Sequence, residues 1–343
     1  MKVLVTGASG FIGGNVAKAF LRHGYEVRVL LRRQSSQKAI QDLLLEGVYG
    51  DLTDPASLER ALQGCEALVH VAAAYALWTP DPAAIYATNV EGTRNILGAA
   101  RQAGVQKVVF TSSESTVGIP RGGGPGREEL VSSLDQLPGH YKKSKYLSEK
   151  LAMEMCQAGL PVIVVNPTTP VGVGDVKPTP TGQIVLDFLK GRMPAYVNTG
   201  LNLIDVEDVA EGHVLALERG RVGERYLLGN RNLTLREVLS ILADITGRKP
   251  PSMRLPLWLA LGIAYLDEGK SRWITHRAPR VPIAGVQAAH KFRFMDCSKA
   301  VHELGLPQHP VEAALEKAVR WFRENGYVDG EVFRKESYRE ASK

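Results

Sequence analysis

A glycine-rich turn close to residue 7 constrains the fold of this chain more than any other feature. It follows a short apolar run, Lys2–Thr6, and precedes a segment of helical periodicity, Gly13–His23. The spacing is G-x-x-G-x-x-G, and its three glycines are Gly7, Gly10 and Gly13. Such a turn lets the backbone approach a pyrophosphate, which then lies against the N-terminus of the following helix. The flanking strand and helix therefore predict a dinucleotide-binding site.

Alternating periodicities continue through the first half of the chain. Short β-rich runs, almost wholly apolar, predict strands at Lys2–Thr6, Glu26–Leu31, Ala67–Val71, Lys107–Ser112 and Pro161–Asn166. Helical patterns lie between them, at Gly13–His23, Leu58–Leu62, Val90–Ala103 and Tyr141–Ala158. Strands that are apolar throughout are typical of a parallel sheet covered by helices on both faces. The pattern predicts an α/β fold of the Rossmann type, a doubly wound parallel sheet.

The rhythm changes after residue 166, where Pro and Gly become frequent. Later helical patterns lie at Gln183–Leu189, Val206–Glu218, Leu235–Thr246 and Val311–Asn325. Open α/β sheets bind ligands at the carboxyl ends of their strands, so a second region is expected to cover that edge. We expect an NAD(P)-binding Rossmann domain at 1–166, to which the segment 204–226 returns. A smaller, mostly helical substrate-binding region is expected at 167–203 and 227–328. A flexible tail is expected at 329–343.

Two arginines, Arg32 and Arg33, follow the second expected strand. An NAD enzyme usually places an acid about 20 residues beyond the glycine turn, where it binds the ribose 2′-hydroxyl. No acid occurs here between Glu26 and Asp42. Two guanidiniums would instead pair with a 2′-phosphate. The expected cofactor is NADP(H), with NAD(H) as a second option, and a solvated basic turn is the alternative reading.

A serine, a tyrosine and a lysine are the candidates for the chemistry. Tyr141 and Lys145 lie four residues apart at the start of an expected helix, so they share one face. The ammonium would then lower the pKa of the phenol from about 10, which makes it an acid or base near neutral pH. Lys145 would also bind the nicotinamide ribose. Ser113, just after the expected strand Lys107–Ser112, would hold the substrate carbonyl or hydroxyl, with Ser112 as the alternative.

A second pair, Tyr146 and Lys150, repeats the same spacing. Five residues at about 100° each turn this pair roughly 140° away from the first, so both pairs cannot face one cofactor. Tyr141 is preferred because Ser144 stands at the fourth motif position and because Tyr141 opens the helix. Tyr146 is expected to be a packed residue and Lys150 a surface charge.

These motifs resemble those of the short-chain dehydrogenase/reductase superfamily. The T-G-x-x-G-F-I-G turn resembles its extended branch, and the Y-x-x-S-K pattern matches the superfamily as a whole. The resemblance implies that Asp51, between the expected strands Glu26–Leu31 and Ala67–Val71, meets the adenine, although it could equally cap the next turn. The residues expected to contact the cofactor are Gly7, Gly10, Phe11, Ile12, Gly13, Arg32, Arg33, Asp51, Leu52, Val71, Ala72, Ala73, Thr111, Tyr141, Lys145 and Pro167.

Two further segments, 159–174 and 202–218, resemble the dihydroflavonol-4-reductase-like group, and within it the bacterial hopanoid-associated sugar epimerases. The resemblance implies a homodimer. Sugar-nucleotide epimerases and dehydratases usually carry an arginine at the position of Asn166. This chain instead has Asn166 followed by Pro167, the form seen in reductases and hydroxysteroid dehydrogenases. Glu114 is a second departure: it would either disfavour an anionic substrate group or turn outward to a basic partner.

Together these residues predict an NADP-preferring oxidoreductase. It would transfer hydride between the nicotinamide and a carbonyl or secondary alcohol of an apolar substrate, using Ser113, Tyr141 and Lys145. The alternative is an NAD(P)-dependent sugar epimerase or dehydratase, which would use the same three residues without net redox change. A third reading is a cofactor-sensing protein without chemistry.

Composition excludes several other classes of protein. The 42 Lys and Arg exceed the 36 Asp and Glu only modestly and are spread along the chain, which suits an anionic small molecule better than nucleic acid. No metal-binding spacing occurs, and the scattered Cys65, Cys156 and Cys297 predict a reducing, cytoplasmic setting without a secretory leader.

The most apolar stretch, Leu255–Leu266, would span about 18 Å as a helix. That is too short for a bilayer core of roughly 30 Å. We expect a buried core helix here, with contact with a membrane surface or with an apolar substrate as the alternatives.

Overall fold

A computed structural model describes residues 1–290 and 292–328, so the expected tail at 329–343 lies outside the described residues. Its centre is a seven-stranded sheet in which every neighbouring pair is parallel, in the order β10-β6-β5-β4-β1-β2-β3. The strands are β1 (Lys2–Thr6), β2 (Glu26–Leu31), β3 (Glu46–Tyr49), β4 (Ala67–His70), β5 (Lys107–Thr111), β6 (Val162–Pro167) and β10 (Arg225–Leu228). The predicted doubly wound α/β fold is confirmed.

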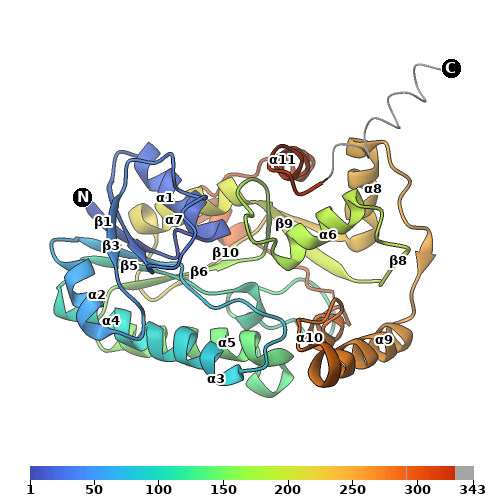
Figure 1. Cartoon of the computed structure of the whole chain (residues 1–343). Helices are drawn as coiled ribbons and strands as arrows, with labels where there is room; N and C mark the ends of the chain where they lie inside the picture. The colour runs from blue at the N-terminus through green and yellow to red at the C-terminus, as the bar shows by residue number, and fades with distance from the viewer. Residues whose placement is uncertain (291, 329–343) are drawn as a thin grey trace.

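Helices cover both faces of this sheet (Figure 1). On β1, Val3 and Val5 belong to the core cluster of one face and Leu4 to that of the other, as expected for a strand buried on both sides. One face carries α1 (Phe11–Arg22) and α7 (Val206–Arg219). The other carries α2 (Pro55–Leu62), α4 (Gly92–Gln102) and α5 (Gly139–Gln157). Before α4 come α3 (Pro82–Tyr86) and the π-turn η1 (Ala87–Glu91).

A smaller region starts where β6 ends, because the chain passes from β6 directly into β7 (Thr169–Val171). It contains a three-stranded sheet, β11-β9-β7, and the short pair β12-β8. Its core joins α6, α8 and α11 to this sheet. The further elements are β8 (Ala195–Tyr196), β9 (Gly200–Asp205), β11 (Arg231–Thr234), β12 (Met253–Arg254), α6 (Pro180–Leu189), α8 (Leu235–Thr246), α9 (Leu257–Lys270), α10 (Ile283–Ala288) and α11 (Val311–Glu324).

Segment 204–226 contributes to both regions. Strand β9 belongs to the small sheet, whereas α7 packs against α1 and β10 pairs with β6 at the edge of the central sheet. The chain thus crosses back to the first region within a few residues. The domain boundaries themselves stay a prediction.

The apolar stretch at 255–266 is not a fully buried core helix as expected, because only one of its faces packs into a small cluster with α10. It forms most of α9, in which only Ala260 and Ala264 are buried. Trp258 is 73% exposed and Leu266 is 78% exposed. Apolar composition cannot distinguish a helix covered on all sides from one that packs by a single narrow face. Among the described residues no helix combines the length and the apolar character needed to cross a bilayer.

Candidate functional site

The predicted site residues follow the carboxyl ends of six neighbouring strands of the central sheet. Because the strands are parallel, these ends lie along one edge of the sheet. The glycine turn follows β1, the paired arginines follow β2, Asp51 and Leu52 follow β3, and residues 71–73 follow β4. Thr111 ends β5 and Pro167 ends β6, while Phe11 and Ile12 open α1. The strand order reverses beside β1, which is the usual position of a ligand in such a sheet.

Two glycines of the turn, Gly7 and Gly13, are packed too tightly for a side chain. Gly7 has φ +77°, and a Cβ built on it would lie 2.7 Å from the backbone nitrogen of Ala72. A Cβ on Gly13 would overlap the carbonyl oxygen of Gly7. Gly10, in extended conformation, caps the N-terminus of α1. The turn therefore places bare backbone and a helix N-terminus at the edge of the sheet, an arrangement suited to a pyrophosphate.

A chain of hydrogen bonds fixes the segment that faces this turn. The Thr6 hydroxyl accepts from the Ala72 N–H at 3.1 Å and lies 2.8 Å from His70 Nδ1. His70 Nε2 lies 3.2 Å from the Thr93 hydroxyl, which donates to the Asn89 carbonyl. Burial lowers the pKa of His70 to about 3, so the ring is neutral and can accept at Nδ1 while donating at Nε2. His70 is a structural residue.

The residues predicted to bind the adenosine half of the cofactor differ in their exposure. Arg32 and Arg33 are exposed, and the Arg33 guanidinium lies 5.5 Å from the ring centre of Tyr49. Asp51 Oδ1 accepts from both the backbone and the hydroxyl of Thr53, at 2.9 and 2.7 Å, so it closes a local turn. Leu52 is buried in the core cluster beneath α2 and α4. A contact of Asp51 with adenine stays a prediction.

Helix α5 brings its lysine to the end of β5. Lys145 is buried, and its ammonium donates to the Thr111 carbonyl at 2.8 Å. The same ammonium lies 5.0 Å from the ring centre of Phe110. Burial lowers the pKa of Lys145 to about 8. The strand and the helix thus place a cation between the sheet edge and the first turn of α5.

Tyr141 lies one helical turn before this lysine, but its pKa does not change as expected. Burial raises the pKa of Tyr141, and Tyr75 and the Glu114 carboxylate raise it further. The expected lowering by Lys145 does not occur in this structure, in which the ammonium donates to the Thr111 carbonyl. The Tyr75 ring meets Tyr141 edge-on, with ring centres 4.3 Å apart. Sequence reasoning missed Tyr75, although it stands two residues after the predicted segment 71–73.

The two candidate serines have different surroundings. Ser113 is half-buried, and its hydroxyl oxygen accepts from the Ser115 backbone at 3.2 Å at the start of the short helix η2 (Glu114–Thr116). Ser112 is buried, and its hydroxyl has no hydrogen-bond partner in the described part of the chain. Ser113 is therefore the more accessible of the two hydroxyls.

Asn89, which resembles a structural position of the extended branch, joins the loop after β4 to α5. Its amide exchanges hydrogen bonds with the backbone of Ala74 and donates to the Ser144 hydroxyl at 2.9 Å. Ser144 in turn donates to the Tyr141 carbonyl at 2.7 Å. Asn89 lies in the π-turn η1, where no regular spacing marks it. It holds the loop that carries Tyr75 against the helix that carries Tyr141.

Glu114 pairs with a basic residue, as one of the two expectations for it stated. Arg293 donates from Nε to the Glu114 carboxylate at 2.8 Å and from Nη2 to the Val117 carbonyl at 3.1 Å. The pair joins the segment after β5 to the smaller region. Its two members are 179 residues apart in the sequence, so no local pattern could predict it.

Asn166 is fully buried next to the candidate serine. Its amide nitrogen donates to the Ser113 carbonyl at 3.1 Å, the Thr116 hydroxyl at 3.0 Å and the Glu149 carboxylate at 2.8 Å. Arg225 pairs with the same carboxylate at 3.0 Å. Asn166 therefore supports the backbone that carries Ser113.

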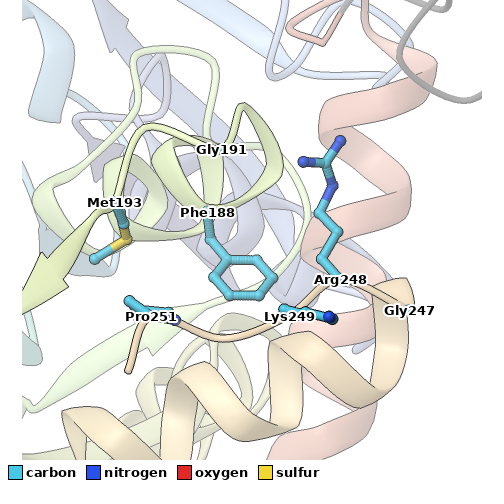
Figure 2. Close-up of a pocket in the computed structure, with 7 residues that line it drawn as sticks. All are labelled: Phe188, Gly191, Met193, Gly247, Arg248, Lys249 and Pro251. Atoms are coloured by element: carbon cyan, nitrogen blue, oxygen red, sulfur yellow. The ribbon is translucent and has the colours of Figure 1, made fainter. Parts of the chain in front are cut away.

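A separate cavity of about 390 Å³ lies in the smaller region, between the loop after α6 and the end of α8. Figure 2 shows the residues that line it, Phe188, Gly191, Met193, Gly247, Arg248, Lys249 and Pro251. None of the predicted catalytic or cofactor-binding residues is among them. The cavity is therefore distinct from the candidate site.

Known proteins resemble the chain over nearly its whole length. Residues 3–229 match the NAD dependent epimerase/dehydratase family. The chain is 47% identical to a Synechocystis protein named "Putative dihydroflavonol 4-reductase", over 94% of this chain and 95% of that protein. It is 38% identical to sterol demethylase protein B of Methylococcus capsulatus, over 96% of this chain and all of that protein. A solved structure of a nucleoside-diphosphate-sugar epimerase from Pseudomonas aeruginosa matches with a TM-score of 0.81 and 29% identity, over 96% and 99% of the two chains.

Proposed function

This chain belongs to the NAD-dependent epimerase/dehydratase family of extended short-chain dehydrogenases/reductases, and on that premise we propose that it is an NADP-preferring reductase. Its reaction is hydride transfer between the nicotinamide and a carbonyl or secondary alcohol of an apolar substrate. The observation that carries the proposal is the meeting of β5 and α5. There Lys145 donates to the Thr111 carbonyl, with Ser113 two residues beyond that carbonyl and Tyr141 one turn before the lysine.

The residues at the sheet edge fit a dinucleotide. Side chains are excluded at Gly7 and Gly13, so the backbone can approach the pyrophosphate at the N-terminus of α1. Arg32 and Arg33 are exposed after β2 and supply two cations for a 2′-phosphate. Bound NADPH supplies the hydride for the reduction. The protein supplies orientation, charge and the proton.

Each catalytic residue has a role that follows from its position. Tyr141 donates its proton to the substrate oxygen as the carbonyl is reduced, and Ser113 donates a hydrogen bond to the same oxygen. Lys145, with a pKa of about 8, is mostly protonated at neutral pH and stabilises the phenolate that remains. The raised pKa of Tyr141 keeps the phenol protonated before the reaction.

An epimerase or dehydratase is the second candidate, supported by the family and by the similarity to the sugar epimerase structure. Asn166 favours the reductase. At the position where sugar-nucleotide enzymes usually carry an arginine, this chain has a buried amide that binds the Ser113 backbone and Glu149. No cation at this position is offered to the phosphates of a nucleotide sugar. The names of the two similar proteins also agree with an apolar substrate.

We further propose a homodimer in the cytoplasm. The family resemblance supports the dimer, with α4 and α5 as the helices that would meet across a two-fold axis. The scattered thiols of Cys65, Cys156 and Cys297 support a reducing compartment.

Tyr141→Phe tests the proposal directly, with Tyr146→Phe on the same helix as its matched control. We expect Tyr141→Phe to lower the rate of NADPH-dependent reduction of apolar ketones by roughly 10²–10⁴-fold, as for loss of a general acid. NADPH affinity should stay within about twofold, because the phenol contributes little to the binding of the pyrophosphate and adenosine. Tyr146→Phe should behave as wild type. A Tyr141→Phe enzyme that kept the wild-type rate would contradict the mechanism.

A further inference from the structure

Helix α9 and the π-turn after it, η4 (Ser271–Thr275), gather exposed apolar side chains on the surface. Of the seventeen large apolar residues that are exposed in the described part of the chain, seven fall between residues 258 and 274. Trp273 is 77% exposed and Ile274 is 72% exposed. We refer to these seven side chains as the α9 surface, and they are Trp258, Leu259, Ile263, Tyr265, Leu266, Trp273 and Ile274.

One face of α9 is used for packing, and Leu257 and Leu261 are partly buried along it. Ala260 and Ala264 lie one turn apart and are buried against α10, together with Val286. At about 100° per residue, Trp258 and Leu266 point away from this alanine face. Figure 1 shows α9 at the periphery of the molecule, beside α10. A helix that is apolar on all sides is typical of a protein core or of a membrane, and here the protein covers only one face of it.

The charged residues around the α9 surface are segregated by sign. Between residues 254 and 280 the acids are Asp267 and Glu268, and both turn inward to cap the chain before α10. Their carboxylates accept from the backbone N–H groups of Val281 at 2.9 Å and Ile283 at 2.5 Å. The basic residues of this segment are all exposed, and they are Arg254, Lys270, Arg272, Arg277 and Arg280. In this segment the exposed apolar side chains are thus accompanied by exposed cations, and the acids are engaged with the backbone.

We propose that the α9 surface docks on an anionic phospholipid bilayer, with α9 lying in the plane of the interface. Exposed tryptophans next to arginines are the combination that membrane interfaces select, since the indole enters the headgroup layer and the guanidinium pairs with phosphate. Trp273 and Arg272 already show this pairing, with the guanidinium 5.8 Å from the ring centre. Charge complementarity therefore favours an anionic lipid surface over an uncharged apolar partner.

Docking would place the membrane one short helix away from the candidate active site. Helix α10 contacts α9 on one side, and its Ala284 lies against Gly139 at the start of α5, two residues before Tyr141. Gly285 of α10 lies against Leu77, two residues after Tyr75. The inference concerns binding alone, so it stands or fails independently of the proposed reaction.

Flotation of the full-length protein with lipid vesicles tests the proposal. The probes are vesicles of phosphatidylcholine alone and of phosphatidylcholine mixed with phosphatidylglycerol. Wild type should float with the anionic vesicles, and added salt should weaken this binding by screening. Arg272→Gln with Arg277→Gln should lower the partition coefficient roughly 25-fold, since each cation near an anionic surface contributes about 1 kcal/mol.

Trp258→Ser with Trp273→Ser should lower binding at least as much, with an unchanged melting temperature because both side chains are exposed. Leu44→Ser is the matched control, because Leu44 is 96% exposed and lies in the first region; it should bind vesicles as wild type does. The proposal is overturned if wild type floats with neither vesicle, or if the tryptophan variant floats like wild type. A third outcome also overturns it: the wild-type protein self-associates without lipid and binds no vesicles, and the tryptophan variant no longer self-associates. The α9 surface would then bind a second copy of the chain.

Discussion

At the scale of single residues, Arg32 and Arg33 govern the choice between NADPH and NADH in this account. Arg32→Ala is expected to raise the dissociation constant for NADPH roughly 10- to 100-fold, because a hydrogen bond to a charged group contributes about 1.5–3 kcal/mol. NADH, which lacks the 2′-phosphate, should lose less than about twofold. Arg101→Ala, on the exposed end of α4, is the control. Equal losses for the two cofactors, measured by fluorescence titration, would refute the role of Arg32.

Lys145 predicts the pH dependence of the reduction. Its folded-state pKa of about 8 means that the ammonium is present below that pH and is lost as pH rises through it. The kcat/KM for carbonyl reduction should therefore fall above pH 8. In Lys145→Arg the guanidinium stays charged throughout this range, so the fall should disappear even if the variant is slower. A fall at the same pH in both enzymes would assign the titration to another group.

Candidate site residues could be predicted from the sequence where they are marked by a regular local spacing. The four-residue interval of Tyr141 and Lys145 and the three-residue interval of the glycines are both of this kind. Tyr75, which meets Tyr141 edge-on, and Arg293, which pairs with Glu114, lie far from their partners in the sequence. Such contacts arise from the tertiary fold, and a single sequence contains no sign of them.

At the scale of elements, the five strands predicted from the sequence agree with the structure to within a residue at either end, whereas β3 and β10 of the same sheet were not among them. Strands β1 and β2 have the predicted bounds, because a strand buried on both faces is a continuous apolar run. The starts of α7, α8 and α11 were predicted correctly, but those of α1 and α5 were placed two residues too late. Helix α1 begins at Phe11 and α5 at Gly139, after the extended caps Gly10 and Pro138, which carry no side-chain capping signal.

Asn89 tests whether the loop after β4 and α5 act as one unit. Asn89→Ala removes hydrogen bonds to Ala74 and Ser144, so the free energy of unfolding should fall by roughly 1–3 kcal/mol. The kcat should fall with it, because Tyr75 and Tyr141 would lose their shared support. The control is Asn325→Ala at the end of α11, which removes a single side-chain bond to the Trp321 carbonyl away from the site. Urea unfolding measures the free energy of unfolding, and steady-state kinetics measures kcat. A destabilised variant with unchanged kcat would contradict this coupling.

At the scale of the whole molecule, the central sheet positions the chemistry and the smaller region adds surfaces of its own. The sheet edge brings the glycine turn, the arginines and the Ser113–Tyr141–Lys145 group to one side of the fold. The smaller region contributes Arg293, the separate cavity and the α9 surface. The alternation of strands and helices predicted the first of these regions well. The exposure of α9 could not be predicted, because hydrophobicity alone does not say what covers a helix.

The most direct test of the central claim is the nicotinamide content of the protein purified without added cofactor. Heat release and mass spectrometry before and after extensive dialysis identify the nucleotide and its occupancy. A reductase exchanges its cofactor at each turnover, so we predict a site that dialysis empties and that rebinds NADPH much more tightly than NADH. Near-stoichiometric NAD(P)⁺ that survived dialysis would contradict the account, because a cofactor recycled in place is the mark of an epimerase or dehydratase.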